Sequence, residues 1–253
     1  MKNVKSIFLL TNSLLFLSLS QAADISGLKI GLKVAPQLTW GLTDNKNTSN
    51  PGTRINVGYG LMIDYYFSNY YALSTEVCIN SYGVNNVIKK DRYDHVSYAG
   101  VDYPNTGDIT MDYRLQYMQV PILIRMRTEE TNRISYFAEF GFGLGLLTRA
   151  RADVSFQNIT LKNVKVSDPD QSDDYRIFYN SGTASAPQYS VFNDNALEVR
   201  SSLIIGGGLH FALGNHSLIV AGLRYDNAFS SFTEEDKWFT KLNYVALNMG
   251  IIF

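Results

Sequence analysis

Apolar and polar residues alternate with a period of two along most of the chain after residue 27. In the first such stretch, Leu28–Trp40, every second residue is apolar and the residues between are polar or small. This period is typical of a β-strand with one apolar face. The eight strands predicted in this way are residues 28–40, 55–67, 71–79, 112–126, 134–146, 197–213, 219–226 and 245–253.

The connections between these strands are alternately long and short. Short turns are expected around Ser68, between Arg127 and Arg133, and at Gly214. The long connections are residues 41–53, 83–111, 150–196 and 227–240. Tight turns at one end and long loops at the other are typical of an up-and-down antiparallel barrel. We therefore predict an all-β protein that forms an eight-stranded antiparallel up-and-down transmembrane β-barrel.

The second face of the predicted strands is polar, which suits the lumen of a small membrane barrel. Five basic and five acidic residues fall on this face and could pair there. They are Lys29, Lys33, Arg54, Asp64, Glu76, Glu139, Glu198, Arg200, Arg224 and Asp226. In a soluble barrel the polarity would be inverted, with apolar side chains inside.

The fourth strand departs from this regular pattern. Leu115 is apolar on one phase, whereas Val120, Ile122 and Ile124 are apolar on the other. A β-bulge near Tyr117 would account for such a slip.

Composition and the N-terminus place the barrel in a bacterial envelope. Only 18% of residues are charged, which is low for a soluble domain, and 33 residues are aromatic. Residues 1–22 combine two lysines, an apolar run and small residues near Ala22, which is typical of a cleaved signal peptide. Residues 23–253 would then form the barrel, with both termini in the periplasm and the long loops outside.

Several segments resemble a known family. Tyr117–Arg125 resembles the fourth-strand signature of the outer-membrane β-barrel domain of porin-family, PorT-like proteins. Phe137–Gly145 is similar to the glycine-rich strand that follows, and Leu28–Lys33 to the first strand. The resemblance covers nearly all of residues 24–253 and implies a membrane barrel. The family's fold does not define an activity.

The resemblance and the pattern together favour a non-catalytic outer-membrane protein with a structural or surface-binding role. Its expected partners are outer-membrane lipid and lipopolysaccharide, the barrel-assembly machinery through the strand ending at Phe253, and an extracellular ligand at the loops. A monomer is expected. The near-zero net charge, with 22 basic and 23 acidic residues, argues against a nucleic-acid partner.

Two other functions remain open from the sequence. A small porin-like channel or transport accessory is disfavoured because eight strands enclose an interior that side chains fill. A lipid-modifying enzyme needs a nucleophile beside a base. The histidines are His95, His210 and His216. Ser202 shares the face of His210 but lies roughly 26 Å away along the strand, and Ser74 could approach His210 only through the register.

Metal and cofactor chemistry is not expected. The segment Asp168–Asp174 has alternating oxygen ligands, but Asp173 and Tyr179 stand where a calcium loop of the EF-hand type needs glycine and glutamate. Cys78, the one cysteine, reads as a small packing residue. No catalytic, cofactor-binding or metal residues are therefore assigned.

The connection at residues 150–196 is too long for a structureless link. It contains its own alternation, for example at Val154 and Phe156. We expect either a hairpin that extends the barrel wall or a loop that folds over the mouth. Long loops on a rigid barrel are also where binding would evolve.

Overall fold

A computed structural model describes most of the chain. The described residues are 27–43, 48–49, 52–89, 93–166, 175–180, 185, 188–191, 196–213, 217–232 and 240–253. The predicted signal peptide and the predicted turn at Gly214 lie outside them. Within the described part, no helix is long and apolar enough to span a membrane.

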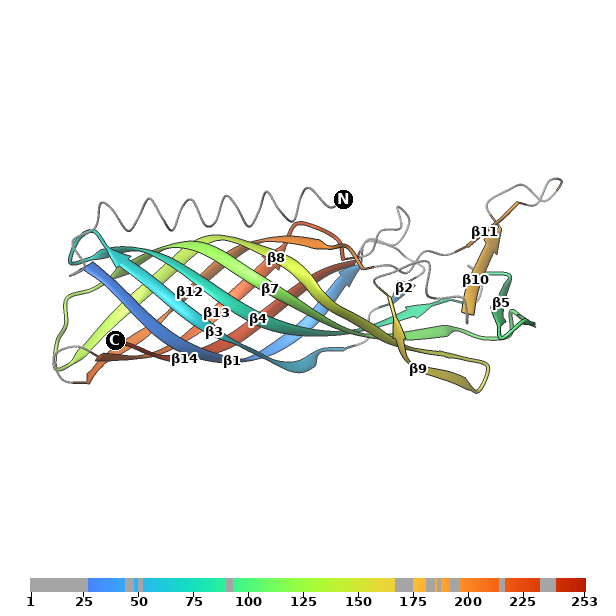
Figure 1. Cartoon of the computed structure of the whole chain (residues 1–253), viewed down its shortest axis with the longest axis horizontal. Coiled ribbons are helices and arrows are strands. Elements are labelled where there is room, and N and C mark those ends of the chain that lie inside the picture. The colour runs from blue at the N-terminus through green and yellow to red at the C-terminus, as the bar shows by residue number, and fades with distance from the viewer. Residues whose placement is uncertain are drawn as a thin grey trace.

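Eight antiparallel strands close into a barrel, which confirms the predicted fold class (Figure 1). Each strand pairs with the next along the barrel, and the β8–β12 pairing closes the ring. The barrel strands are β1 (Leu28–Thr43), β3 (Arg54–Tyr66), β4 (Tyr71–Ile88), β7 (Ile109–Arg127), β8 (Ile134–Phe156), β12 (Val199–Leu213), β13 (Ser217–Ala228) and β14 (Thr240–Ile252).

The alternation in the sequence sets the two faces of this barrel. Leu32 of β1 lies opposite Leu61 of β3 and Ile251 of β14, all on the outward face. Phe142 and Leu223 show how exposed this wall is, since each keeps 62% of its surface accessible. Such apolar exposure suits a surface that hydrocarbon covers.

Several strands are longer than the sequence predicts, and β4, β7 and β8 continue beyond the barrel at one end (Figure 1). β8 turns at Gln157 and Asn158, which both have positive φ, and returns as β9 (Ile159–Lys165). The two-residue strand β2 (Thr48–Ser49) pairs with the end of β4. Within the described part of residues 150–196, β8 and β9 form a hairpin that extends the wall, which is one of the two expected forms.

A second, smaller sheet lies beyond the barrel at the same end (Figure 1). Its order is β11-β10-β5-β6. The strands are β5 (His95–Tyr98), β6 (Val101–Pro104), β10 (Tyr175–Asn180) and β11 (Tyr189–Val191). We call the small sheet, β9 and the extensions Ser81–Ile88, Ile109–Gln116 and Arg149–Phe156 the arm.

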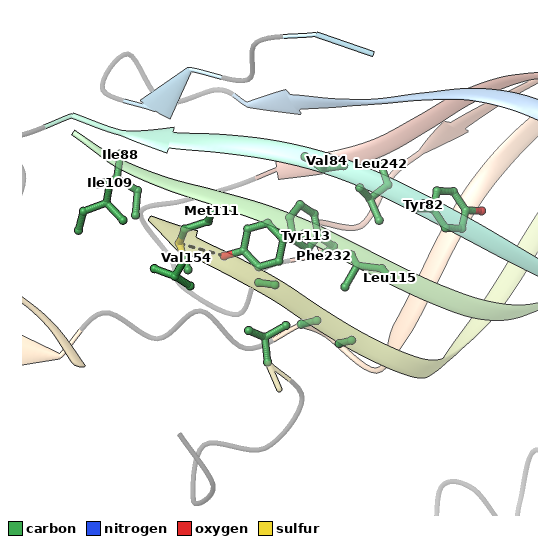
Figure 2. Packing of buried hydrophobic residues seen from close by; sticks show 14 of the residues in the cluster. Tyr82, Val84, Ile88, Ile109, Met111, Tyr113, Leu115, Val154, Phe232 and Leu242 are labelled. Carbon is green, nitrogen blue, oxygen red and sulfur yellow. Dashed lines mark hydrogen bonds between the residues drawn. The ribbon is translucent and has the colours of Figure 1, made fainter. Parts of the chain in front are cut away.

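The arm has a hydrophobic core that continues into the adjoining end of the barrel, where Ala35, Leu242 and Ala246 belong to the same cluster. Val84 and Ile88 of β4, Ile109 of β7 and Val154 of β8 are at most 2% exposed and lie in one cluster. Figure 2 shows these side chains directed toward one another between the extended strands. Phe232 closes the cluster by packing edge-on against Tyr113, with ring centroids 5.1 Å apart.

The structure has a bulge at the level of Tyr117, as predicted, but the bulge lies in β8 and not in β7. Gln116 of β7 pairs with Arg149 and Tyr117 pairs with Leu147, so the extra residue is Thr148 of β8. The hydroxyl of Thr148 donates to the carbonyl of Gln116 at 2.9 Å. β7 itself keeps one phase throughout, with Leu115, Tyr117 and every second residue of the strand buried.

Candidate functional site: the barrel lumen and the arm

The middle of the lumen is occupied by an ion-pair network centred on Arg224 of β13. Its two terminal nitrogens donate to the two carboxylate oxygens of Glu76, both at 2.8 Å, and Nε donates to Glu139 at 2.8 Å. All three side chains are at most 3% exposed. Buried charges require such pairing, because an unpaired one would lose its hydration without compensation.

The network continues along the barrel on both sides of Arg224. Lys33 donates to Glu76 at 2.8 Å. Arg125 donates to Glu139 at 2.9 Å and also pairs with Asp64. Three cations and three anions therefore form one neutral chain across β1, β3, β4, β7, β8 and β13.

A second polar group surrounds Asp226. Its carboxylate accepts hydrogen bonds from Arg200, from Ser202 at 3.0 Å and from Gln119 at 2.9 Å. Arg200 also donates to the carbonyl of Leu242 at 2.7 Å. The charges of this group are again balanced, so the lumen holds equal numbers of buried cations and anions.

Aromatic rings cover the lumen charges toward the arm. The guanidinium of Arg200 lies 5.0 Å from the ring centroid of Tyr82 and 6.0 Å from that of Tyr244. Tyr82 also packs edge-on against Tyr117 and Tyr244. Both cation–π contacts and edge-to-face rings are favourable. Together they make the transition from the charged lumen to the apolar core of the arm.

The structure places seven of the ten predicted lumen charges inside the barrel. These are Lys33, Asp64, Glu76, Glu139, Arg200, Arg224 and Asp226. Lys29 is only half-buried, and Arg54 and Glu198 are exposed. Arg54 is exposed because it is the first residue of β3, at the end of the barrel, where it pairs with Asp112 at 2.8 Å. Lys29 and Arg54 still lie on the inward phase, opposite the buried Asp64 and Thr39, but near the strand ends, and Glu198 directly precedes β12. The prediction therefore holds for the face of Lys29 and Arg54, but these three residues are not enclosed in the lumen.

Arg125 is the lumen cation that the sequence analysis missed. Its position next to Ile124, an apolar residue of the outward phase, already puts it on the inward phase. An unbroken odd-numbered phase from Ile109 to Arg125 would have identified it.

The candidate catalytic residues that the structure describes do not form a nucleophile–base pair. His210 is buried and stacks on Phe137 at 4.5 Å, and neither ring nitrogen has a hydrogen-bond partner. Ser74 instead donates to Asp64 at 2.5 Å, and Ser202 donates to Asp226. His95 belongs to the small sheet, where it stacks on Phe178, and His216 lies outside the described residues.

The remaining candidates from the sequence are Cys78 and the acidic segment Asp168–Asp174. Cys78 is buried on the inward face, with its sulfur 3.5 Å from Glu76. The acidic segment Asp168–Asp174 lies outside the described residues. Among the residues that are described, no group of three or more His, Cys, Asp or Glu side chains could hold a metal ion.

A tyrosine anchors the start of the small sheet within the arm. Tyr93 is 4% exposed and donates a hydrogen bond to the carbonyl of Gly107. Burial raises the pKa of its hydroxyl above the ordinary value. Asn105 donates to the carbonyl of Tyr93 at 2.6 Å, which fixes the same corner of the arm.

Comparison with solved structures finds other outer-membrane barrels. Neisserial surface protein A is similar with a TM-score of 0.43 and 12% identity, over 89% of this chain and 96% of that chain. For Ail, the attachment invasion locus protein of Yersinia pestis, in complex with the heparin analogue sucrose octasulfate, the values are 0.38 and 14%, over 89% and 97%. For the N-terminal β-barrel domain of Pseudomonas aeruginosa OprF, they are 0.32 and 8%, over 88% and 97%.

Comparison by sequence gives a family. No curated protein matches the chain significantly. The family described as "Outer membrane protein beta-barrel domain" matches residues 20–234, which is most of the chain. This match agrees with the closed eight-stranded barrel, its apolar wall and its charged lumen. The chain therefore belongs to the outer membrane protein beta-barrel domain family, whose fold implies the bacterial outer membrane.

Proposed function

We propose that this chain is a non-catalytic surface protein, in which the barrel is a membrane anchor and the arm makes the specific contacts outside the cell. One observation carries the proposal: the described residues of the arm form a folded extension of paired strands, whose buried apolar core continues into the mouth of the barrel. Binding sites commonly lie on segments that a rigid scaffold holds in place.

The lumen supports an anchor in preference to a channel. Charged side chains from six strands fill the middle of the barrel and are at most 3% exposed, apart from Lys33 at 9%. Water-filled porins use about 16 strands or more. A small channel is the second candidate, and it would require these ion pairs to part.

The proposed orientation places the short turns and both termini in the periplasm. Phe253 follows the last strand, where its amide donates to the carbonyl of Ile30 at 2.8 Å and its side chain is 59% exposed. An exposed terminal aromatic of this kind suits recognition by the barrel-assembly machinery. We also propose that the protein is a monomer and that it is a PorT-like member of the family.

Surface labelling tests the orientation. Lys162→Cys lies on β9 in the arm, and Glu129→Cys lies in the short turn between β7 and β8. A membrane-impermeant maleimide should label Lys162→Cys on intact cells and Glu129→Cys only after the outer membrane is permeabilised. The native Cys78 is buried and serves as the unlabelled background. The opposite labelling pattern contradicts the proposal.

Two further measurements separate the alternatives. In planar bilayers we expect no steady single-channel openings, and steady openings would favour the channel. The enzyme alternative predicts that His210→Ala and Ser74→Ala abolish a modification of outer-membrane lipid, whereas we expect the lipid composition to be unchanged.

A further inference from the structure

A cluster of arginines lies on the outward face of the sheet where the arm leaves the barrel. Arg114 of β7 and Arg149 of β8 are exposed, and Arg151 of β8 is half-buried. They line a cavity of about 300 Å³ together with Gln116 and Asn163.

The pairing of the strands brings these cations together. Arg114 lies directly opposite Arg151, and Gln116 lies directly opposite Arg149. Like charges in directly opposite positions destabilise a sheet. A bound anion would remove this cost, so the arrangement has a physical reason if the cavity holds a negatively charged ligand.

The neighbouring carboxylates neutralise only part of the cluster. Arg114 pairs with Asp153 at 2.5 Å, and Arg54 pairs with Asp112 at 2.8 Å. Within the described part of the chain, Arg149 and Arg151 have no carboxylate partner; Arg151 only donates to a backbone carbonyl at 3.4 Å. Two positive charges therefore remain available beside the cavity.

The height of the cluster relative to the apolar wall indicates the kind of anion. The outward residues of β7 are apolar from Met126 up to Met118, and those of β8 are apolar from Ile134 up to Leu146. Beyond this level the outward residues are Gln116 and then Arg114 on β7, and Arg149 and then Arg151 after the bulge on β8. The headgroups of membrane lipids lie at this level, directly outside the hydrocarbon.

This charge is local and does not form a ring around the barrel. Toward the same end, the outward residues Trp40 of β1, Ser201 of β12 and Asn227 of β13 are uncharged, and β14 contributes the single cation Lys241 opposite Leu42. A general attraction to an anionic surface would not require the cations to gather on one pair of strands.

We propose that this cavity binds the phosphate of a lipid headgroup in the outer leaflet, with Arg149 and Arg151 donating to the phosphate oxygens. A guanidinium presents two parallel donors that match phosphate geometry. The apolar side chains of Met118 and Leu146 lie just below and would contact the acyl chains. The choice of leaflet rests on the proposed function, because it requires the arm to be outside.

Native mass spectrometry of the purified protein in detergent tests this site. The probes are lipid A with its phosphates, dephosphorylated lipid A, and inorganic phosphate as a competitor. We expect the protein to retain phosphorylated lipid A, and Arg149→Gln with Arg151→Gln to weaken binding by roughly tenfold or more, since each charge-assisted hydrogen bond is worth about that factor. Dephosphorylated lipid A should bind equally weakly to both proteins.

A matched control removes the same charge elsewhere. Lys89→Gln with Arg133→Gln changes two exposed cations away from the cavity and should bind lipid A as the unsubstituted protein does. Equal binding of both lipid A forms, or unchanged binding by the double arginine variant, overturns the proposal. If inorganic phosphate competes at concentrations equal to that of lipid A, the ligand is a free anion, and the proposal of a lipid ligand is overturned.

Two safeguards keep the test decisive. Heat-dependent gel migration reports whether each variant folds. If the double variant does not fold, Arg149→Gln alone is tested in its place. Binding to the unsubstituted protein should also weaken with rising salt, and a salt-independent affinity contradicts the site. Because binding is measured in detergent, it can fail while surface labelling still places the arm outside, and the two proposals are judged separately.

Discussion

Three strands, β4, β7 and β8, line both the lumen and the core of the arm, yet the two interiors have opposite chemistry. In the barrel, the inward residues of β4, β7 and β8 include Glu76, Arg125 and Glu139. In the arm, the inward residues of these strands include Val84, Tyr113 and Val154. Lipid covers the outside of the barrel and excludes polar side chains from it, whereas water covers the outside of the arm and favours them. The external solvent therefore determines which face is apolar.

The largest expected effect comes from shifting the phase of β7 at this boundary. Deleting Gln116 would turn Ile109, Met111 and Leu115 outward, with a loss of about 1.5–3 kcal/mol for each. The arm should then be digested by protease while the barrel keeps its heat-dependent migration.

A deletion directly across the sheet is the control for this phase shift. Thr148 is the extra residue of the bulge, so its removal leaves a regular β8 in which Val154 still faces inward. We expect the arm to stay resistant to protease. Equal sensitivity in the two deletion variants would contradict the assigned bulge.

The boundary also explains which parts of the structure the sequence could predict. The barrel wall was predictable because lipid imposes strict alternation on it. β7 shows a phase slip in its sequence without a bulge, since its apolar residues move from outward to inward while the backbone stays regular. β8 has a bulge but no phase slip in its sequence. The bulge turns the even-numbered residues from outward to inward at the same level where the apolar face changes from outward to inward. Even-numbered residues therefore stay apolar or small from Ile134 to Phe156.

The arginine cavity could not be found in the same way. Its residues come from five strands, and Arg114 and Arg151 are far apart in sequence. Only the register of β7 against β8 shows that they are opposite one another. The lumen network was found in part, because its charges fall on a single phase, but the choice of ion-pair partners depends on which strands face each other across the barrel.

The next largest effect is expected inside the lumen. Arg224→Met would leave one uncompensated negative charge in the network and should destabilise the barrel by about 3–5 kcal/mol. Unfolding by urea in lipid vesicles, followed by gel migration, measures this loss. A change below about 1 kcal/mol would mean that water reaches the lumen and screens its charges.

A double variant sharpens the result for the lumen. Arg224→Met with Glu139→Gln leaves two intact pairs, Lys33 with Glu76 and Arg125 with Asp64. Since the network is then neutral again, we expect it to recover more than half of the lost stability. No recovery would show that Arg224 acts through packing and not through its charge.

A smaller effect on stability should distinguish the lipid-facing and water-facing parts of the outward face of β7. Ile122→Arg places a charge in the apolar wall of β7 and should cost about 2–4 kcal/mol near the middle of the bilayer. Thr110→Arg lies on the same outward face but in the arm, where a surface substitution should change stability by at most about 0.5 kcal/mol. The same unfolding measurement compares them. Similar costs would contradict the placement of the membrane boundary between these residues.

The smallest expected effect concerns the ionisation of Tyr93 in the arm. Burial raises the pKa of its hydroxyl, so the neutral form is favoured in the folded state. Its contribution is therefore complete below the ordinary tyrosine pKa of about 10 and is lost as the pH rises through the folded-state pKa. Tyr93→Phe removes the hydrogen bond to Gly107 at a cost of about 0.5–1.5 kcal/mol. Subtracting the tyrosinate absorbance of this variant from that of the unsubstituted protein isolates the Tyr93 titration. A midpoint at or below 10 would show that water reaches this corner, and that the arm is less tightly closed than the lumen.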